Sequence, residues 1–241
     1  MNPALAIEGL TYAYGPKVAL RDVTFAVEAG QFCALLGPNG AGKSTLFSLL
    51  VRLLVARQGR IGVAGHDMAR APRAALAAMG VVFQRPTLDL DMTVLGNMRY
   101  FAALHGLSGR TAQQRIEAAL EQLEMAERAD ELVRALNGGH RRRMEIARAL
   151  IHAPRILLLD EPTVGLDAQS RRAITAHVHR LADDGVAVLW ATHLVDEIAP
   201  EDAVVVLHQG EVLARQLAGE LSGARPLADV FLEMTGAGQG A

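Results

Sequence analysis

One short glycine-rich stretch constrains this chain more than any other part of its sequence. It fits the pattern G-x-x-x-x-G-K-[ST] and consists of Gly37, Pro38, Asn39, Gly40, Ala41, Gly42, Lys43, Ser44 and Thr45. An apolar, strand-like run over 32–36 enters it and a helix-like run over 45–50 leaves it. Such loops wrap backbone N–H groups around a polyphosphate at a helix N-terminus. We therefore expect a nucleotide-phosphate site, with Lys43 on the β- and γ-phosphates and the Ser44 hydroxyl on Mg²⁺.

Lysine usage supports this interpretation. Only Lys17 and Lys43 are lysines among 24 basic residues, so arginine is used almost everywhere else. Lys17 falls in a predicted loop, whereas Lys43 stands at the phosphate position of the motif.

The composition is that of a folded globular protein with no general affinity for nucleic acid. The chain has 241 residues, 51% of them hydrophobic and 21% charged, and a net charge of −2. Cys33 is the single cysteine and is expected to be a buried apolar residue rather than a redox switch. No apolar run reaches the roughly 18 residues that cross a bilayer, and residues 1–8 lack the pattern of a secretion signal. We expect a soluble or peripheral protein.

The pattern of apolar residues predicts an α/β fold with an inserted helical lobe. Alternating runs, typical of antiparallel strands, lie at 7–15, 20–27 and 59–65. Unbroken apolar runs, typical of central parallel strands, lie at 80–83, 156–159 and 186–190. Two short strands, at 203–207 and 211–215, and a helix at about 227–234 follow.

Between residues 86 and 153 only helical periodicity is present. It predicts helices at 94–104, 111–124 and 139–152, the second of them with a capping start at Thr111. We interpret 86–153 as a helical subdomain inserted into a nucleotide-binding core formed by 1–85 and 154–241. The fold class is then an α/β phosphate-loop NTPase core, with a mostly parallel sheet plus an antiparallel β subdomain.

Two acids follow the apolar run at 156–159. Ligands of open α/β sheets sit outside the carboxyl ends of the strands, so Asp160 and Glu161 should lie beside the phosphate loop. Asp160 is the expected holder of Mg²⁺, and Glu161 is placed to polarise an attacking water. Together with the loop, this pair indicates hydrolysis of a nucleoside triphosphate.

Four further motifs stand in a fixed order around these two sites. They are Val82-Phe83-Gln84-Arg85-Pro86, Leu136-Asn137-Gly138-Gly139-His140, Glu161-Pro162-Thr163-Val164-Gly165-Leu166-Asp167 and Leu189-Trp190-Ala191-Thr192-His193. In this order of elements the sequence resembles, over essentially its entire length, the nucleotide-binding subunit of ATP-binding cassette (ABC) transporters. The second motif departs from the common Leu-Ser-Gly-Gly-Gln signature at Asn137 and His140.

The resemblance implies a role for single residues of one subunit. Gln84 would contact the Mg²⁺ shell and sense the membrane subunit, and His193 would be the switch histidine of catalysis. Tyr14 would stack on the adenine of ATP, beside Tyr12 on the same strand face.

The resemblance also implies a dimer. Asn137, Gly138 and Gly139 of one subunit would meet the γ-phosphate held by the other, and Asp167 would cross between them. The partners would be a second copy of the chain, as a homodimer around two ATP, and a separate integral-membrane subunit. The chain would then lie on the cytoplasmic face of the inner membrane as a peripheral subunit.

Other nucleotide-binding classes fit less well. A GTPase should carry Asn-Lys-x-Asp, which is absent, and a small-molecule kinase lacks the signature and Asp167. An ABC ATPase acting in DNA repair or translation remains the main alternative, although such proteins usually carry two cassettes, zinc or coiled-coil insertions or basic extensions. A binding module without turnover is a third. The segment 226–236 resembles the terminal helix of cassettes that serve bacterial ABC-2-type exporters, which favours export.

Two surface features complete the predictions. Apolar residues near Gln84 exceed what a thin lobe needs for its own core and are expected to form a groove for a helix of the membrane partner: Leu88, Leu90, Met92, Val94, Met98 and Phe101. The basic run 141–143 is expected to be a solvated helix face.

Overall fold

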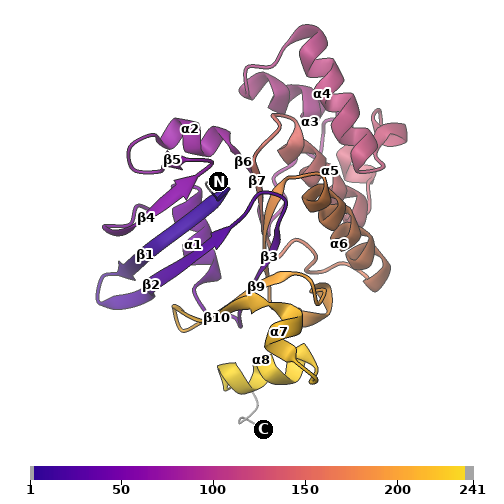
Figure 1. Cartoon of the computed structure of the whole chain (residues 1–241). Helices are drawn as coiled ribbons and strands as arrows, with labels where there is room; N and C mark the ends of the chain where they lie inside the picture. The colour runs from indigo at the N-terminus through magenta and orange to yellow at the C-terminus, as the bar shows by residue number, and fades with distance from the viewer. Residues whose placement is uncertain (1–2, 237–241) are drawn as a thin grey trace.

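The computed structural model of this chain describes residues 3–236, and in that part the strands form two sheets (Figure 1). The antiparallel sheet has the order β2-β1-β4-β5 and contains β1 (Leu5–Tyr14), β2 (Lys17–Val27), β4 (Gln58–Val63) and β5 (His66–Asp67). The main sheet has the order β10-β9-β3-β8-β7-β6 and contains β3 (Phe32–Leu36), β6 (Met79–Val82), β7 (Ile156–Asp160), β8 (Ala187–Thr192), β9 (Ala203–His208) and β10 (Glu211–Leu217). All of its neighbouring pairs are parallel except β10 with β9.

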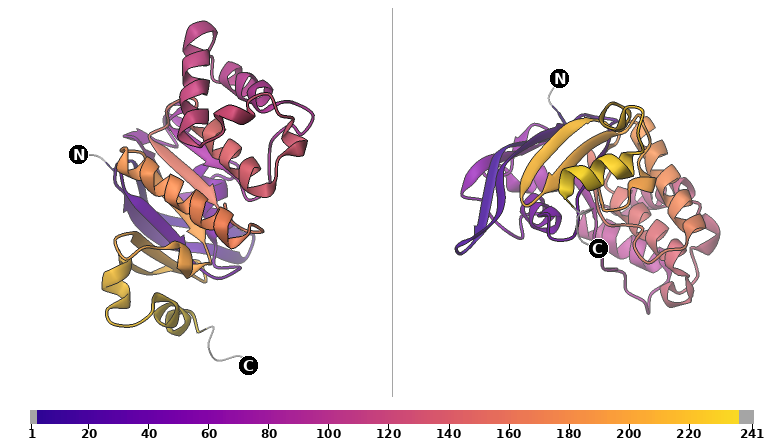
Figure 2. Two further views of the ribbon diagram at one scale, coloured as in Figure 1. Left: turned by 90° about the vertical axis from the view of Figure 1, so that its right-hand side faces the viewer. Right: turned by 90° about the horizontal axis from the view of Figure 1, so that it is seen from below.

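Helices cover both faces of the main sheet. They are α1 (Lys43–Leu50), α2 (Pro72–Ala77), α3 (Val94–Leu104), α4 (Gly109–Gln122), α5 (Gly138–Leu150), α6 (Ala168–Asp183), α7 (Ala218–Ser222) and α8 (Leu227–Thr235), with 3-10 turns η1 (Ala126–Arg128), η2 (Val133–Ala135) and η3 (Val195–Glu197). The antiparallel sheet and α1 lie on one side, and α5 and α6 lie on the other (Figure 1). The left view of Figure 2 shows α3 and α4 at one end of the molecule and α8 at the opposite end. A bilayer-spanning helix is absent from residues 3–236, because every helix there is too short or too polar to cross one.

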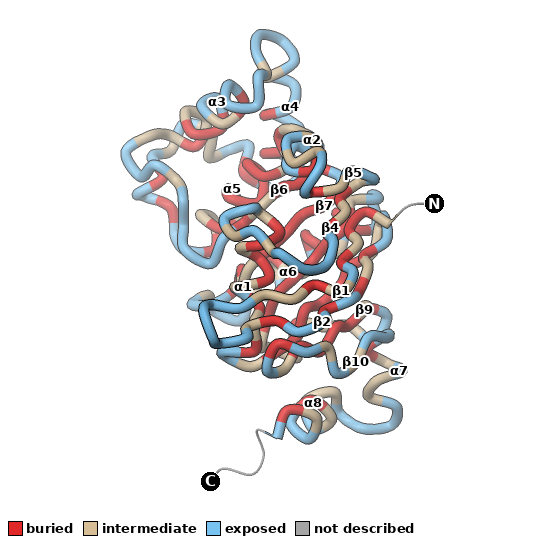
Figure 3. Tube along the Cα trace, turned by 90° about the vertical axis from the view of Figure 1, so that its left-hand side faces the viewer, coloured by how far each residue is buried: buried red, intermediate tan, exposed pale blue. Residues whose placement is uncertain are grey.

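The main sheet separates two hydrophobic clusters, and the alternation of side chains along each strand decides which residue joins which cluster. In β3, Phe32, Ala34 and Leu36 pack with the helices α3 to α6. Cys33 and Leu35 face the opposite way and pack with α1 and the antiparallel sheet. Buried residues therefore run through the strands at the centre of the molecule, whereas much of α4 is exposed and α8 contains exposed, half-buried and buried residues (Figure 3). Burial also raises the pKa of the Cys33 thiol to about 12, so it remains a protonated apolar group as expected.

The predicted strand at 80–83 is parallel but not central. As β6 it forms an edge of the main sheet and pairs on one side with β7. The helices α2 and α5 pack against it and account for its burial, so the apolar run reflects this cover rather than a central position.

Two local predictions are also wrong. The second lobe helix begins at Gly109 after Ser108, so Thr111 lies inside α4 instead of capping it. Lys17 is the first residue of β2 rather than part of a loop, and it pairs with Tyr14 across the turn.

Candidate active site

The glycine-rich stretch connects the carboxyl end of β3 to α1, as its pattern predicts, and its glycines meet specific steric demands. Gly40 and Gly42 have φ values of 81° and 113°, in the left-handed region that glycine adopts at little cost. A Cβ atom on Gly37 would lie 2.5 Å from the carbonyl oxygen of Leu207 on β9. The loop can thus pass close to the sheet and lead directly into the N-terminus of α1.

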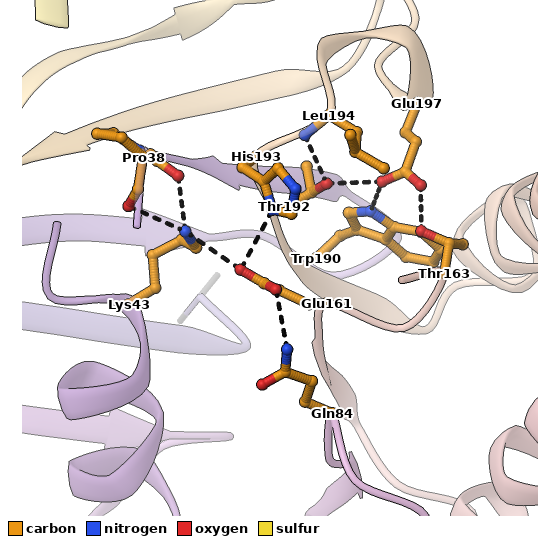
Figure 4. Close-up of polar contacts among 11 residues, drawn as sticks. Pro38, Lys43, Gln84, Glu161, Thr163, Trp190, Thr192, His193, Leu194 and Glu197 are labelled. Carbon is orange, nitrogen blue, oxygen red and sulfur yellow. Dashed lines mark hydrogen bonds and ion pairs between the residues drawn. The ribbon is translucent and has the colours of Figure 1, made fainter. Parts of the chain in front are cut away.

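Lys43 is buried at the start of α1, with 5% of its surface exposed. Its ammonium Nζ donates to the carbonyl oxygens of Gly37 at 2.6 Å and Pro38 at 3.3 Å, and lies 3.4 Å from Oε1 of Glu161 (Figure 4). The loop's own carbonyl groups and one carboxylate therefore hold this cation in place. A bound phosphate would meet an ammonium whose position is already fixed.

Glu161 is the point at which the predicted catalytic residues meet. Besides Lys43, its carboxylate accepts a hydrogen bond from Nε2 of Gln84 at 3.2 Å, and Nδ1 of His193 lies 3.4 Å from it (Figure 4). Glu161 also has a φ of 47°, which is unusual for a residue with a side chain. Backbone strain of this kind occurs at functional sites where the surroundings hold the residue in place. The sequence did not indicate this strain.

A cavity of about 470 Å³ opens over the loop and is lined by Tyr14, Lys17, Val18, Ala19, Pro38 to Thr45, Glu161 and Gln209. Tyr14 is 48% exposed at its rim and packs edge-on against Tyr12, with ring centroids 5.0 Å apart. The structure therefore brings the glycine-rich loop, Tyr14 and Glu161 to one cavity. Lys17, which was expected only to fall in a loop, lines it as well.

The residues expected to hold Mg²⁺ have suitable chemistry. Ser44 is exposed and lines the cavity, and Asp160 ends β7 immediately before Glu161. Burial and the neighbouring charge of Glu161 raise the pKa of Asp160, while Lys43 lowers it. Two adjacent carboxylates thus share one lysine, which leaves an excess of negative charge that a cation would relieve. Mg²⁺ is commonly bound by one or two protein oxygens plus the phosphates of its substrate, so this small set fits it. No cluster of three or more His, Cys, Asp or Glu side chains suited to a metal occurs between residues 3 and 236.

The signature residues and Asp167 do not line this cavity; Gly138 and Gly139 instead come close to Leu166 and Ser170, on either side of Asp167 in the sequence. Asn137 caps α5, with its Oδ1 accepting from the backbone N–H of His140 at 2.8 Å. Asp167 caps α6 in the same way, and hydrogen bonds from the backbone and side chain of Ser170 lower its pKa. A Cβ on Gly139 would lie 2.7 Å from Oγ of Ser170, so this glycine is needed for packing within the subunit as well.

A buried carboxylate beside this site was missed from the sequence. Glu197 accepts hydrogen bonds from Nε1 of Trp190 at 3.0 Å, from Oγ1 of Thr192 at 2.7 Å and from Oγ1 of Thr163 (Figure 4). It is 6% exposed and joins the end of β8, next to His193, to the segment after Glu161. The indole of a tryptophan in an apolar strand needs an acceptor, and this was the signal available.

Both surface predictions need correction. The basic run is not a uniformly solvated face, because Arg142 is 6% exposed and only its neighbours are partly accessible. Of the proposed groove residues, Val94 and Met98 are fully buried in the core, whereas Leu90 is 42% exposed. Periodicity alone could not separate the core positions from the accessible ones.

Comparisons with known proteins agree with this geometry. The family described as "ABC transporter" matches residues 20–164, more than half of the chain. The "Nod factor export ATP-binding protein I" of Ralstonia nicotianae is 37% identical over 221 residues, which are 91% of this chain and 69% of that protein. The "Daunorubicin resistance ATP-binding protein DrrA3" of Streptomyces coeruleorubidus is also 37% identical, over 91% of this chain and 70% of its own. The "Linearmycin resistance ATP-binding protein LnrL" of Bacillus subtilis is 33% identical, over 97% and 75%.

Solved structures show the same fold. One described as the ATP-binding subunit of an ABC transporter is 26% identical and superposes with a TM-score of 0.84 over 96% of this chain and 99% of its own. The cbiO1 protein of Clostridium perfringens, part of the transporter complex cbiONQ, is 27% identical, with a TM-score of 0.86 over 97% and 96%. The expected fold class, α/β with an antiparallel β subdomain and added helices, is confirmed. The chain belongs to the ABC transporter family and is one of its ATP-binding, ATP-hydrolysing cassettes.

Proposed function

We propose that this chain is the ATP-hydrolysing subunit of an exporter, acting as a homodimer that closes around two ATP and drives a separate integral-membrane subunit. The relatives' names support export, since one is a Nod factor export protein and two are drug-resistance proteins. The same names favour a transporter over an ABC ATPase of DNA repair or translation. The corresponding place in the cell is the cytoplasmic face of the inner membrane, with the chain as a peripheral subunit.

The observation that carries the chemistry is the convergence of three side chains on Glu161. Lys43, Gln84 and His193 all lie within 3.4 Å of its carboxylate. In this arrangement Glu161 would align and polarise the attacking water, and Gln84 and His193 would fix the carboxylate. The loop amides and Lys43 would hold the phosphates, and Tyr14 would stack on the adenine.

Mg²⁺ would be held by Ser44 and Asp160, with Gln84 reaching its hydration shell. When bound, it would supply positive charge that offsets the charge developing on the phosphate oxygens. Because Asp160 and Glu161 already share one lysine, ATP without a divalent cation should bind poorly to this site.

The proposal also divides the chain into two working parts. Residues 1–85 and 154–241 would form the nucleotide-binding core, and 86–153 would form the helical subdomain that carries the signature. Asn137 to Gly139 and Asp167 line no part of the subunit's own cavity, which supports a site completed by a second copy.

Accessible apolar side chains on the helical subdomain support a docking surface for the membrane partner. Tyr100 and Leu104 are 58% and 63% exposed and lie one turn apart on α3. Leu90, in the segment before α3, is also accessible. These residues replace the buried Val94 and Met98 as the proposed contacts.

Hydrolysis by purified protein tests the proposal. Glu161→Gln keeps the shape of the side chain but removes its negative charge, so Mg²⁺-dependent ATP hydrolysis should fall roughly 10²- to 10⁴-fold. ATP should still bind, and the variant should accumulate as an ATP-bound dimer in size-exclusion chromatography. Glu121→Gln, at an exposed position of α4, is the matched control. Near wild-type hydrolysis by Glu161→Gln would show that another group aligns the water.

A further inference from the structure

A row of buried charges runs along one face of α5, the helix that begins at the signature. Arg142, Glu145 and Arg148 follow each other at intervals of three residues and are 6%, 1% and 4% exposed. Charges are this deeply buried only where they are paired and hydrogen-bonded, since their desolvation is costly. Their partners therefore show what the helix holds.

Arg142 holds the backbone on which Gln84 stands. Its Nη1 donates to the carbonyl oxygen of Phe83 at 2.7 Å and its Nη2 donates to that of Gln84 at 3.0 Å. Nη1 also lies 2.8 Å from Oε2 of Glu145 on the next turn. One guanidinium thus binds two consecutive carbonyl groups with its two ends, which fixes both their positions and their directions.

Glu145 and Arg148 hold the same segment three residues further on. Oε1 of Glu145 accepts from the backbone N–H of Thr87 at 2.9 Å, and Nη1 of Arg148 donates to the carbonyl oxygen of Thr87 at 2.9 Å. Arg148 also stacks on the ring of Phe101 in α3, 4.0 Å from the ring centroid. The segment 83–87 is therefore tied to α5 at both ends.

The electrostatic balance explains why these groups occur together. Burial raises the pKa of Glu145, while Arg142, the Thr87 N–H and Arg148 act in the opposite direction. Burial likewise lowers the pKa of each arginine, and Glu145 opposes the change. The removal of any one charge would leave the others poorly compensated, so the cluster acts as a unit.

We propose that Arg142 and Glu145 are positioning residues for ATP hydrolysis, which hold the backbone of Gln84 so that its amide reaches Glu161. The inference rests on the proposed catalytic roles of Gln84 and Glu161. On this inference α5 connects two parts of the site. Asn137 lies at the N-terminus of the helix, and the buried face of the helix positions the loop whose Gln84 contacts the carboxylate of Glu161. A shift of α5 would then alter the contact between Gln84 and Glu161.

A double-mutant cycle with Gln84→Ala tests the inference. Arg142→Met removes the guanidinium but keeps much of the apolar stem, and it should lower kcat roughly tenfold, within the range of coupling between residues of one network. KM for ATP should change little, because Arg142 does not line the nucleotide cavity. In protein that already carries Gln84→Ala, Arg142→Met should cause almost no further loss. Glu145→Gln should behave in the same way.

Arg143→Met is the matched control, since Arg143 neighbours Arg142 in sequence but faces Glu124 on the outside of the lobe. It should leave kcat unchanged. Melting temperatures are measured for every variant, and if Arg142→Met does not fold, Arg142→Lys, which keeps a cation but loses the two-ended contact, takes its place in the cycle.

The possible outcomes distinguish a failure of this inference from a failure of the proposed ATP hydrolysis. Equal losses from Arg142→Met with and without Gln84 would show a general structural role and overturn the inference. A rise in KM with kcat unchanged would also overturn it, by placing the effect in nucleotide binding. If Gln84→Ala itself is silent, Arg142 cannot act through Gln84 and the inference fails, whereas the loss of hydrolysis in Glu161→Gln would still support the proposed function.

Discussion

The residue Asn137 offers a sharp test of the proposed dimer, because two explanations of it predict opposite effects of one substitution. Within the subunit, Asn137 is a helix cap whose Oδ1 lies 2.8 Å from the N–H of His140. In the proposed dimer it also donates a hydrogen bond to the γ-phosphate bound by the other copy. Asn137→Asp retains the capping oxygen but replaces the NH₂ donor by a negative oxygen.

The two effects can be estimated separately. Aspartate and asparagine cap helices about equally well, and a negative charge at the N-terminus of α5 adds about 0.3–1 kcal/mol of favourable interaction with the helix dipole. The stability of the isolated subunit should therefore stay equal or rise slightly. Against a phosphate at about 5 Å, with an effective dielectric constant of about 20, each pair of unit negative charges repels by about 3 kcal/mol. That corresponds to a loss of more than roughly 100-fold in hydrolysis.

The assay compares melting temperature, ATP binding and phosphate release for the wild type, Asn137→Asp and Asn137→Ser. Serine caps as well as asparagine and can donate through its hydroxyl, so Asn137→Ser should remain active. Asn137→Asp should be stable, should bind ATP to its own cavity and should fail to hydrolyse it or to form an ATP-dependent dimer. Normal hydrolysis by Asn137→Asp would show that Asn137 acts only as a helix cap, and it would refute a site completed by Asn137 of a second copy.

Three further predictions concern separate parts of the molecule. Lys43→Ala should weaken ATP binding roughly 10- to 100-fold in a nucleotide titration, which is the usual cost of a lost charged hydrogen bond. Arg57→Ala, on an exposed bend, should leave ATP binding unchanged, and equal losses from the two variants would refute a phosphate role for Lys43. Leu104→Glu should leave the melting temperature and basal hydrolysis unchanged but lower transport by the assembled complex. Wild-type transport by this variant would show that α3 is not part of the docking surface. Burial lowers the pKa of His179, but its hydrogen bonds and the charge of Asp202 outweigh burial, and the net shift is upward. This pair therefore stabilises the fold fully below about pH 6.5 and less as the pH rises through the raised pKa of His179. The difference in unfolding free energy between wild type and His179→Gln should shrink from about pH 6 to 9. A difference that does not change with pH would contradict this prediction.

Local patterns were sufficient to predict most of the fold. The parallel strands β7 and β8 are continuous apolar runs, and the loop before α1 is fixed by its glycines, so short-range sequence determines both. The edge position of β6 could not be predicted in this way. An apolar run shows that a strand is buried, but not whether neighbouring strands or packed helices bury it. The start of α4 at Ser108 could not be predicted either, since Thr111 is an equally suitable capping residue and local sequence does not decide between the two.

At the candidate site, sequence motifs pointed to the residues that the structure gathers around Glu161 but not to the groups that support them. Arg142 belonged to a run expected to be a solvated helix face, and Glu145 was not singled out. Their burial depends on a loop about sixty residues earlier in the chain. Glu197 is a similar case, because its role becomes visible only when Trp190 and Thr163 are placed beside it in space. A charged residue in a sequence is most often exposed, and only its tertiary partners reverse that expectation.

These supporting contacts attach the N-terminal half of α5 to two other parts of the chain, and together they limit how its end can move. Asn137 stands at its N-terminus, the close approach of Gly139 to Ser170 ties that end to the cap of α6, and Arg142 ties its next turn to the backbone of Gln84. Because Ser170 in turn holds Asp167, a displacement of the start of α5 must move Asp167 or Gln84, or break a buried contact. Packed interiors resist small continuous deformation, so such an element passes on a displacement rather than absorbing it. Contact of the signature with a neighbouring subunit would then be felt at Glu161 of the same chain through Gln84, even though Asn137 lies outside that cavity.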